Sequence, residues 1–269
     1  MFEPWLKRWA LVPDGEPIIT PGSRLLPVRM GPAPAMLKIA MDADEQVGNQ
    51  LMIWWDGEGA APVFAHHEQA LVMERAMGSR SLMRMALEGQ DDEASQILCM
   101  ALSRLHTPRS LPSPPLVPLA LWFKSLRWAA ELQAGPYALS LATAEALLAD
   151  PQDVVVLHGD MHHDNVLDFG PRGWLAIDPK RVIGECGFDY ANLICNPDLP
   201  TAADPHRFQR QIDVVADAAG LERRRLLRWV LAFAGLSAAW FLEDNDTVSA
   251  AGQLQVAKMA AGALEAQGH

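Results

Sequence analysis

At 269 residues the chain is long enough to bury a substantial hydrophobic core, either in one large domain or in two lobes. Its composition is 50% hydrophobic and 20% charged, and no apolar run approaches the roughly 20 residues of a membrane span, so we predict a globular protein with no membrane partner. The formal net charge of −11 argues against binding to nucleic acid and is compatible with a cationic partner.

The cysteines and the N-terminus bear on the cellular compartment. The three cysteines, Cys99, Cys186 and Cys195, show no paired spacing, which indicates reduced thiols rather than disulfide bonds. The N-terminal segment has a glutamate and a proline too early for a secretory signal. We therefore predict a cytoplasmic protein.

The first 75 residues are predicted to form a small lobe of strands with one helix among them. Pro21-Gly22-Ser23 separates two strand-like segments and is typical of a hairpin turn. Residues 42–55 carry acids in their first turn, where the helix dipole favours them, and are predicted to be helical. The strand-like segments are residues 16–20, 24–30, 34–40 and 62–76, the last of which is read as two strands.

Beyond residue 76 the pattern becomes mainly helical. Residues 91–105 place six apolar side chains on one helical stripe, and a proline-rich connection follows at 108–118. Short strands and a polar loop occupy 154–177. Further helices are predicted over residues 119–132, 139–148, 205–219, 222–242 and 248–266. The pattern predicts an α+β protein with an N-terminal lobe of residues 1–75 and a larger, mostly helical lobe of residues 76–269.

The segment VVVLHGDMHHDNVLDFGPRGWLAIDPK, residues 154–180, carries a spacing that indicates chemistry. Asp160 follows an apolar run, Asn165 lies five residues later, and Asp178 lies thirteen residues after Asn165. Phosphotransferases use an aspartate, an asparagine and a second aspartate in this order on a strand–loop–strand unit. The first aspartate can accept or orient an alcohol proton, and the other two side chains offer the oxygen ligands that Mg²⁺ prefers.

A phosphotransferase also needs a cation for the nucleotide phosphates and a carboxylate to position that cation. Lys38 lies in the apolar strand-like run AMLKIA, an unusual place for a lysine, and can supply the first. Glu45, at the start of the following helix, can supply the second. Combined with the spacing of the polar loop, these two residues predict a phosphotransferase site.

Two other interpretations of the loop stay open at this point. One is a zinc or di-metal hydrolase, since imidazole and carboxylate groups suit such ions, but it would leave Asn165 and Lys38 without a role. The other is a polar loop with no chemistry. We interpret His158 as bracing the loop, while His162 and His163 stay open between bracing, substrate contact and solvent. The residues available to a hydrolase would be His158, Asp160, His162, His163 and Asp164.

Seven stretches spread over nearly the whole chain carry a family resemblance. They are PAMLKIA, WWDGEGAAPVFA, LVMERA, LHGDMHHDNVLDFG, RGWLAIDP, GFDYANLICNPDL and GLSAAWFLED. In these stretches the chain resembles the aminoglycoside phosphotransferases, and in particular the streptomycin 6-kinase group. The resemblance implies a bilobal protein-kinase-like fold.

The resemblance also implies roles for the residues singled out by spacing. Asp160 is expected to be the catalytic aspartate, and Asn165 and Asp178 the magnesium ligands. Lys38 is expected to contact the phosphates of ATP, with Glu45 as its partner on the helix.

Further positions follow from the resemblance alone. The backbone of Glu74 and Ala76 is expected to bind the adenine edge of ATP, and Asp189 to brace the catalytic loop from below. No GxGxxG motif occurs, so the turn at Ser23 stands in as the segment that covers the phosphates. Lys180, two residues beyond a metal ligand, is open between contact with phosphates and solvent.

The activity implied is ATP-dependent and Mg²⁺-dependent phosphorylation of streptomycin, most simply at the 6-hydroxyl of its streptidine ring, with antibiotic resistance as the result. The guanidinium groups of streptomycin pair with carboxylates in bidentate geometry. A solvated helix end is the alternative for Glu243 and Asp244. The residues expected to contact this substrate, besides Asp160, are Asp164, Glu185, Glu243 and Asp244, with Trp240 as a stacking face.

Two alternative functions stay open. The chain could be a kinase of another small hydroxyl- or amine-bearing metabolite, such as a sugar or hydroxyurea. It could also be a non-catalytic nucleotide-binding module, although all five expected catalytic positions hold chemically competent residues.

Overall fold

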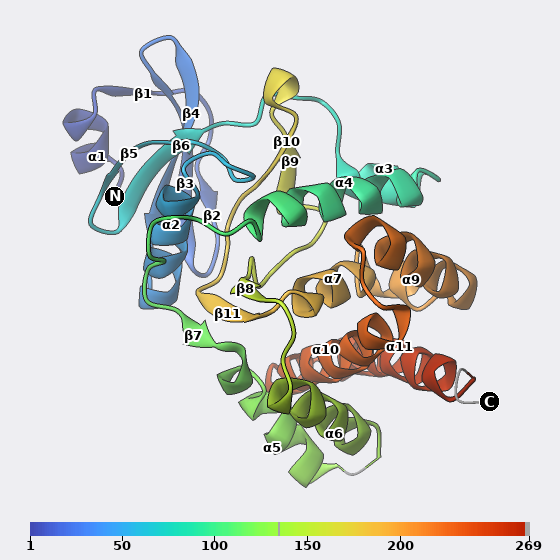
Figure 1. Cartoon of the computed structure of the whole chain (residues 1–269). Helices are drawn as coiled ribbons and strands as arrows, with labels where there is room; N and C mark the ends of the chain where they lie inside the picture. Colours follow the sequence, from blue (N-terminus) through green and yellow to red (C-terminus); the bar gives the residue numbers. More distant parts are fainter. Residues whose placement is uncertain (134, 267–269) are drawn as a thin grey trace.

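The N-terminal lobe is built on a six-stranded antiparallel sheet (Figure 1). The computed structural model describes residues 1–133 and 135–266. The strands follow the order β1-β3-β4-β6-β5, and β2 pairs with β3. The elements of this lobe are α1 (Glu3–Arg8), β1 (Leu11–Pro13), β2 (Ile18–Ile19), β3 (Ser23–Met30), β4 (Ala33–Ala40), α2 (Ala43–Trp55), β5 (Val63–His67) and β6 (Ala70–Glu74).

Strand alternation in β4 decides which side chains reach the interior of the protein. Successive side chains of a strand point to opposite faces of the sheet. Leu37 and Ile39 belong to a small core against which Trp5 of α1 and Trp9, just after α1, pack. Lys38 therefore points to the other face, where α2 packs. The lysine is buried there because it has carboxylate partners on that side.

Helix α2 is capped and docked at defined points. The Asp42 side chain accepts a hydrogen bond from the Glu45 amide at 2.9 Å, which satisfies a free donor of the first turn. Gly48 faces the second lobe so closely that a Cβ atom would lie 2.5 Å from the carbonyl oxygen of Pro179. The first half of α2 is therefore held against the segment that follows Asp178.

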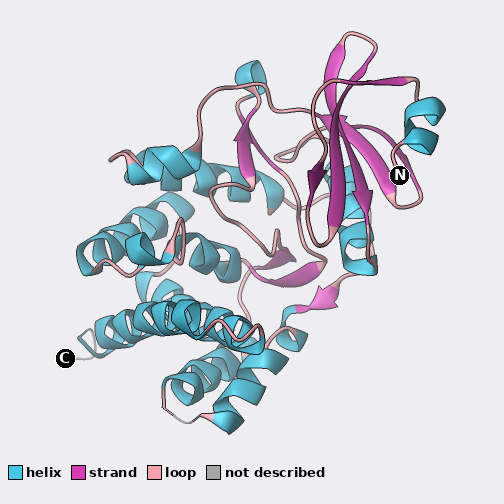
Figure 2. Cartoon of the chain, turned by 180° about the vertical axis from the view of Figure 1, so that it is seen from behind, coloured by secondary structure: helices cyan, strands magenta, loops and turns pink. Residues whose placement is uncertain are grey.

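The second lobe is mostly helical (Figure 2). Its helices are α3 (Leu82–Leu87), α4 (Asp91–Leu105), α5 (Lys124–Leu132), α6 (Pro136–Ala149), α7 (Gly187–Ile194), α8 (Leu199–Ala202), α9 (Pro205–Ala219), α10 (Arg223–Glu243) and α11 (Thr247–Ala266), with 3₁₀ turns at Leu119–Leu121 and Gly170–Arg172. Its short strands are β7 (Val117–Pro118), β8 (Val154–Val156), β9 (Val166–Asp168), β10 (Trp174–Ala176) and β11 (Val182–Glu185).

Helix α10 forms the centre of this lobe. It packs against α5, α6, α7, α9 and α11. Among the described residues it is the helix whose length and apolar composition would allow it to cross a membrane, but 72% of that window is buried inside the protein. Its apolar character is accounted for by this burial. Nearby, Arg207 on α9 forms a buried bidentate ion pair with Asp91 at the start of α4, which ties these two helices together.

Most predicted elements are present. The hairpin at residues 21–23, the helix that begins after Asp42, the two strands within 62–76 and the three C-terminal helices are confirmed. The helix predicted over 119–132 is wrong in one respect, because it divides into a 3₁₀ turn and α5. Helices α1, α3, α7 and α8 and strands β1, β7 and β11 were not predicted; they are short and offer little periodicity.

The lobe division at residue 75 stays a prediction. The chain leaves β6 at Glu74 and enters α3 at Leu82, through a connection with no regular structure over most of its length. The second lobe as predicted includes residues 134 and 267–269, which lie outside the described residues.

Candidate active site

The loop between β8 and β9 is held rigidly from below by Asp189. This side chain, in the first turn of α7, is fully buried. Its two carboxylate oxygens accept hydrogen bonds from the backbone amides of His158 and Gly159, each at 2.8 Å. The Nε2 atom of His106 lies 2.9 Å from the same carboxylate. The predicted position of Asp189 beneath the loop is confirmed.

His158 braces the loop through both ring nitrogens. Its Nδ1 atom accepts a hydrogen bond from the Asp160 amide at 3.2 Å, so Nε2 carries the hydrogen that is donated to the Ile177 carbonyl at 2.8 Å. The ring stacks on Trp55 with centroids 6.4 Å apart. Burial lowers the pKa of His158, so the ring is a neutral structural group. The loop residues therefore keep their backbone positions without a ligand.

Asp160 opens onto the large cavity of the structure, which has a volume of about 790 Å³. Its carboxylate is partly exposed, and the Nε2 atom of His162 lies 3.9 Å from it. The cavity lies between α2 and the helical lobe and is lined by Asp44, Val117, Leu121, Trp122, Lys124, Arg127, Gly159, Asp160, Lys180, Arg181, Asn192, Phe233 and Trp240. A carboxylate at the wall of a cavity of this size can meet a hydroxyl group of a bound small molecule.

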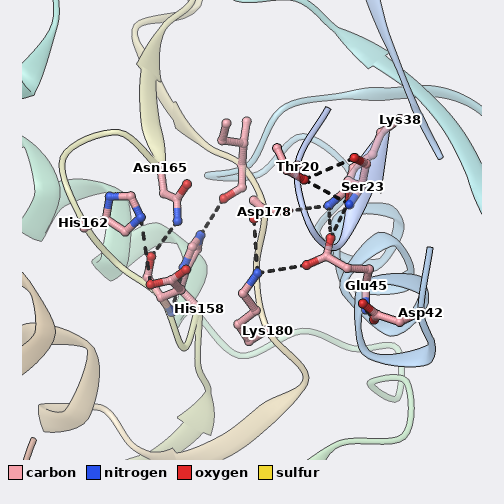
Figure 3. A network of polar contacts seen from close by, with 12 residues as sticks. Thr20, Ser23, Lys38, Asp42, Glu45, His158, His162, Asn165, Asp178 and Lys180 are labelled. Carbon is pink, nitrogen blue, oxygen red and sulfur yellow. Dashed lines mark hydrogen bonds and ion pairs between the residues drawn. The ribbon is translucent and has the colours of Figure 1, made fainter. Parts of the chain in front are cut away.

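Two lysines and two carboxylates close a ring beside this cavity (Figure 3). The Nζ atom of Lys38 lies 2.7 Å from Glu45 and also contacts Asp178. The Nζ atom of Lys180 lies 3.0 Å from Glu45 and 3.2 Å from Asp178. The sequence left Lys180 open between phosphates and solvent, and the structure places it inside this ring.

The ring keeps both of its carboxylates ionised. Burial alone would raise the pKa of Asp178, but the ammonium groups of Lys38 and Lys180 outweigh burial and hold that pKa below its ordinary value. The pKa of Glu45 is lowered in the same way, with Lys38 as the main opposing charge. Burial would lower the pKa of Lys180, but Asp178 and Glu45 raise it overall. All three groups are charged at neutral pH.

The residues expected to bind magnesium lie at the same end of the β9–β10 pair, Asn165 just before β9 and Asp178 shortly after β10. The Nδ2 atom of Asn165 donates a hydrogen bond to the Asp160 carbonyl at 2.8 Å, so its amide oxygen faces the opposite side (Figure 3). Asp178 adopts a left-handed conformation with φ of 59°, and its carboxylate contacts Lys38 and Lys180. One amide oxygen and one carboxylate fit a hard cation that takes its other ligands from phosphates and water.

A second, smaller cavity of about 160 Å³ lies on the other side of the ring. Lys38, Glu45, Asn165 and Asp178 line its polar part. The apolar lining comes from both lobes, with Leu25, Met52, Leu71, Met73 and Ile177. At this volume the cavity can receive part of a nucleotide, such as a flat base against the apolar lining, with the phosphates toward Lys38.

Of the remaining positions expected to bind nucleotide, Ser23 lines this smaller cavity, while Glu74 and Ala76 follow its lining residue Met73 in the chain and are not part of its described lining. The hydroxyl of Ser23 donates a hydrogen bond to Glu45 at 2.9 Å, so this side chain reaches the ring. The Glu74 amide donates to the Pro62 carbonyl at 2.8 Å, which leaves only its carbonyl for a ligand. Within the described chain, the Ala76 amide makes no hydrogen bond and could donate one.

The acids expected to contact substrate are largely elsewhere, and Glu185 is a correction. Its carboxylate is buried and accepts hydrogen bonds from Arg225, Trp229 and the Gln152 amide. A carboxylate with its oxygens engaged by four protein donors cannot also bind a substrate guanidinium.

Of the other expected contacts, Trp240 lines the large cavity, where its ring meets Trp122 edge-on with centroids 5.8 Å apart. Glu243 is exposed and accepts a hydrogen bond from the Ser125 hydroxyl at 3.1 Å. Asp164 and Asp244 are also exposed, and none of these three acids belongs to the described lining of the cavity.

The lining residues of the large cavity that sequence reasoning missed include Asp44 and Trp122. Asp44 precedes Glu45 in the first turn of α2, and its carboxylate lies 2.6 Å from Arg181. Its sequence signal was visible, but the first-turn acids were read only as favourable to the helix dipole. Trp122 had no such signal, because it lies in a short connection between a 3₁₀ turn and α5.

The arrangement does not favour a metallohydrolase. Over residues 1–133 and 135–266, no group of three or more histidine, cysteine or acidic side chains is placed to hold a metal ion. Both ring nitrogens of His163 are buried without a hydrogen-bond partner, and burial lowers the pKa of this ring to about 3. His163 is therefore a neutral residue beneath the loop.

Comparison with known proteins identifies the family. A family model described as aminoglycoside/hydroxyurea antibiotic resistance kinase matches residues 8–245. The chain belongs to this family. It is 52% identical over 246 residues to a streptomycin 3''-kinase of Klebsiella pneumoniae, with 89% of this chain and 92% of that one covered. It is 31% identical over 277 residues to a streptomycin 6-kinase of Streptomyces griseus, with 93% and 85% covered.

The fold of this resistance kinase is also that of solved structures. It matches a crystal structure of aminoglycoside phosphotransferase APH(4)-Ia in complex with ADP and hygromycin B with a TM-score of 0.67, covering 96% of this chain and 97% of that one. Sequence identity in this match is 13%, so the likeness concerns the fold alone. The predicted bilobal, protein-kinase-like α+β fold is confirmed.

Proposed function

We propose that this chain is a streptomycin phosphotransferase that uses ATP and Mg²⁺ and transfers the phosphoryl group to the 3''-hydroxyl. The observation that carries the proposal is the position of Asp160, at the wall of a cavity of about 790 Å³ and beside the ring of Lys38, Glu45, Lys180 and Asp178. A hydroxyl acceptor on one side and nucleotide phosphates on the other would meet at this carboxylate.

The residues of the site divide the chemistry between them. Asp160 would accept the proton of the acceptor hydroxyl, and Asn165 and Asp178 would hold Mg²⁺. Magnesium, when bound, would neutralise charge on the transferred phosphoryl group. Lys38 would contact the nucleotide phosphates and Glu45 would keep it in place. Catalysis would then consist mainly of positioning and charge neutralisation.

The proposal that the chain binds a nucleotide is supported by the smaller cavity and by a solved structure of the same fold. Met73 lines the apolar slot of about 160 Å³, and the Ala76 amide three residues later could donate a hydrogen bond to an adenine edge. The APH(4)-Ia complex of the same fold holds ADP. We propose that Glu74, Ala76 and Ser23 lie along the bound nucleotide.

The large cavity suits a cationic substrate in spite of its basic residues. Four of its lining residues are basic, but Arg181 is paired with Asp44, and Lys180 is paired inside the ring. Aromatic faces from Trp122, Phe233 and Trp240 line the same space and attract cations. We propose Asp44 as a carboxylate that receives a guanidinium group of streptomycin, in exchange for the guanidinium of Arg181.

The choice of the 3''-hydroxyl replaces the sequence-based expectation of the 6-hydroxyl. It is supported by the higher identity to the 3''-kinase, 52%, than to the Streptomyces griseus 6-kinase, 31%. With the 3''-hydroxyl at Asp160, the streptidine ring and its guanidinium groups would lie farther from the catalytic aspartate. Asp44, or the exposed acids at the end of α10, would then be in reach of them.

The proposal extends to the location and the biological role of the protein. The three cysteines are free and buried, in agreement with a cytoplasmic protein. Phosphorylation would change the charge and shape of streptomycin, and we propose antibiotic resistance as its consequence.

The test is a reaction of purified protein with Mg²⁺, ATP and streptomycin, followed by NMR of the product. We expect the phosphate on the 3'' position and a loss of turnover of about 10² to 10⁴ in Asp160→Asn, with the fold and nucleotide binding kept. A phosphate on the streptidine ring would return the acceptor to the 6-hydroxyl. Phosphorylation of hydroxyurea or a sugar without turnover of streptomycin would reject the proposed substrate.

A further inference from the structure

Lys180 occupies a position that the roles proposed for the other site residues do not explain. Its side chain lines the large cavity together with Gly159 and Asp160. Its Nζ atom meanwhile contacts Glu45 and Asp178, which line the smaller cavity on the other side. Lys180 therefore stands at the boundary between the acceptor space and the nucleotide space.

The backbone of Lys180 is fixed to the catalytic loop. Its amide donates a hydrogen bond to the His158 carbonyl at 2.7 Å, two residues before Asp160. Gly159 has φ of 81°, and a Cβ atom there would lie 3.0 Å from the Lys180 Cβ and 2.7 Å from a methyl group of Val182. Only glycine allows this close approach. The lysine is thus held at a set distance from Asp160 by the same loop.

The two lysines of the ring approach their shared carboxylates from different sides. Lys38 comes from β4 and lines the smaller cavity, whereas Lys180 comes from the helical lobe and lines the larger one. Lys38 and Glu45 both border the space proposed for the nucleotide. The second ammonium is placed where a group would pass from one cavity to the other.

The ammonium of Lys180 has hydrogen-bonding capacity for this role. It has three N–H donors, of which one is directed to Glu45 and one to Asp178. A third donor is left, and the side chain is 28% exposed on the side of the cavity. With Asp178 engaged by a metal ion, the bond to Glu45 would still hold the ammonium in place.

We propose that Lys180 is a catalytic residue that contacts the phosphoryl group during its transfer; this rests on the proposed function. In that step the acceptor oxygen forms a bond to the γ-phosphorus, and the bond from that phosphorus to the β,γ-bridging oxygen breaks. The electron pair leaves with ADP, and the hydroxyl proton goes to the Asp160 carboxylate. The oxygens of the group in transfer carry negative charge at the boundary where Lys180 lies, and its ammonium stabilises them.

The test compares Lys180→Met, which keeps the chain length and removes the charge, with Lys180→Arg. We expect kcat to fall by about 10² to 10³ in Lys180→Met and to be partly kept in Lys180→Arg. Lys258→Met is the matched control, because Lys258 lies exposed on α11 and makes no ion pair with another described residue. Its kcat should stay within about threefold of the wild type.

Calorimetric titration with MgADP and with MgAMP-PNP separates phosphoryl contact from a mere link between the lobes. AMP-PNP carries a third phosphoryl group that ADP lacks. In Lys180→Met we expect affinity for AMP-PNP to fall by at least about tenfold while affinity for ADP changes by less than about threefold. An equal loss for both nucleotides, or a kcat within about threefold of the wild type, would overturn the proposal.

Two further results keep the interpretation clear. A melting temperature close to that of the wild type shows that Lys180→Met folds. If Lys180→Met does not fold, the kcat that is kept in Lys180→Arg tests the role of the positive charge instead. If the wild type leaves streptomycin unmodified, the proposed function fails. The comparison of ADP with AMP-PNP still supports or overturns the contact between Lys180 and the terminal phosphoryl group.

Discussion

The substitution Glu185→Gln separates a structural carboxylate from a substrate-binding one. In the structure one carboxylate oxygen accepts hydrogen bonds at 2.6 Å from both Arg225 Nε and Trp229 Nε1. The other accepts from Arg225 Nη2 at 2.6 Å and from the Gln152 amide at 2.9 Å. Glutamine keeps one acceptor oxygen and replaces the other by a donor, so two of these four bonds lose their acceptor.

The size of the effect follows from those two bonds. Hydrogen bonds to charged groups contribute about 1.5–3 kcal/mol each, and breaking a buried ion pair costs about 3–5 kcal/mol. Because Arg225 keeps some solvent contact, the expected loss is below that of a fully buried pair. We expect Glu185→Gln to lower the free energy of unfolding by about 2–4 kcal/mol. For a chain of this size that is a fall in melting temperature of about 4–16 °C.

The assay pairs thermal unfolding with steady-state kinetics. Glu185→Gln should melt earlier than the wild type, with the KM for streptomycin unchanged in the protein that remains folded. Glu243→Gln is the matched control, because this exposed acid has one hydrogen bond, from Ser125, and its loss should change stability by less than about 0.5 kcal/mol. A normal melting temperature together with a tenfold higher KM, or more, in Glu185→Gln would refute the structural role.

The remaining predictions concern substrate charge and pH. Asp44→Asn should raise the KM for streptomycin about tenfold, or roughly 1.4 kcal/mol, and leave the KM for ATP unchanged in initial-rate assays; an unchanged streptomycin KM would place the guanidinium groups elsewhere. Burial holds the pKa of His163 at about 3, so below pH 6.5 the unfolded chain binds a proton that the folded chain does not, and stability falls with pH. This residue alone should remove about 1.4 kcal/mol per pH unit between pH 6 and pH 4. The free energy of unfolding, measured at pH 6 and pH 4, should fall less in His163→Leu than in the wild type. Equal falls in the two proteins would contradict a neutral, buried His163.

Local patterns along the chain are sufficient to predict several features of this protein. The short apolar run around Lys38 indicated a strand that contains a lysine, and β4 has this form. The first-turn acids after Asp42 marked the start of α2. The spacing of Asp160, Asn165 and Asp178 predicted that one strand–loop–strand unit would carry them, because neighbouring residues on a tight hairpin stay close in any fold.

Which charged groups contact one another depends on the packing of distant segments. Glu185 and Asp44 have the same chemistry in the sequence, yet Glu185 is engaged by Arg225, 40 residues away, while Asp44 lines the large cavity. Lys180 reaches Glu45 across 135 residues. Contacts of this kind depend on how helices and lobes pack. An ion pair between distant residues produces no periodic or spaced pattern in the sequence. The position of each acid and base therefore follows from packing, which a single sequence does not encode locally.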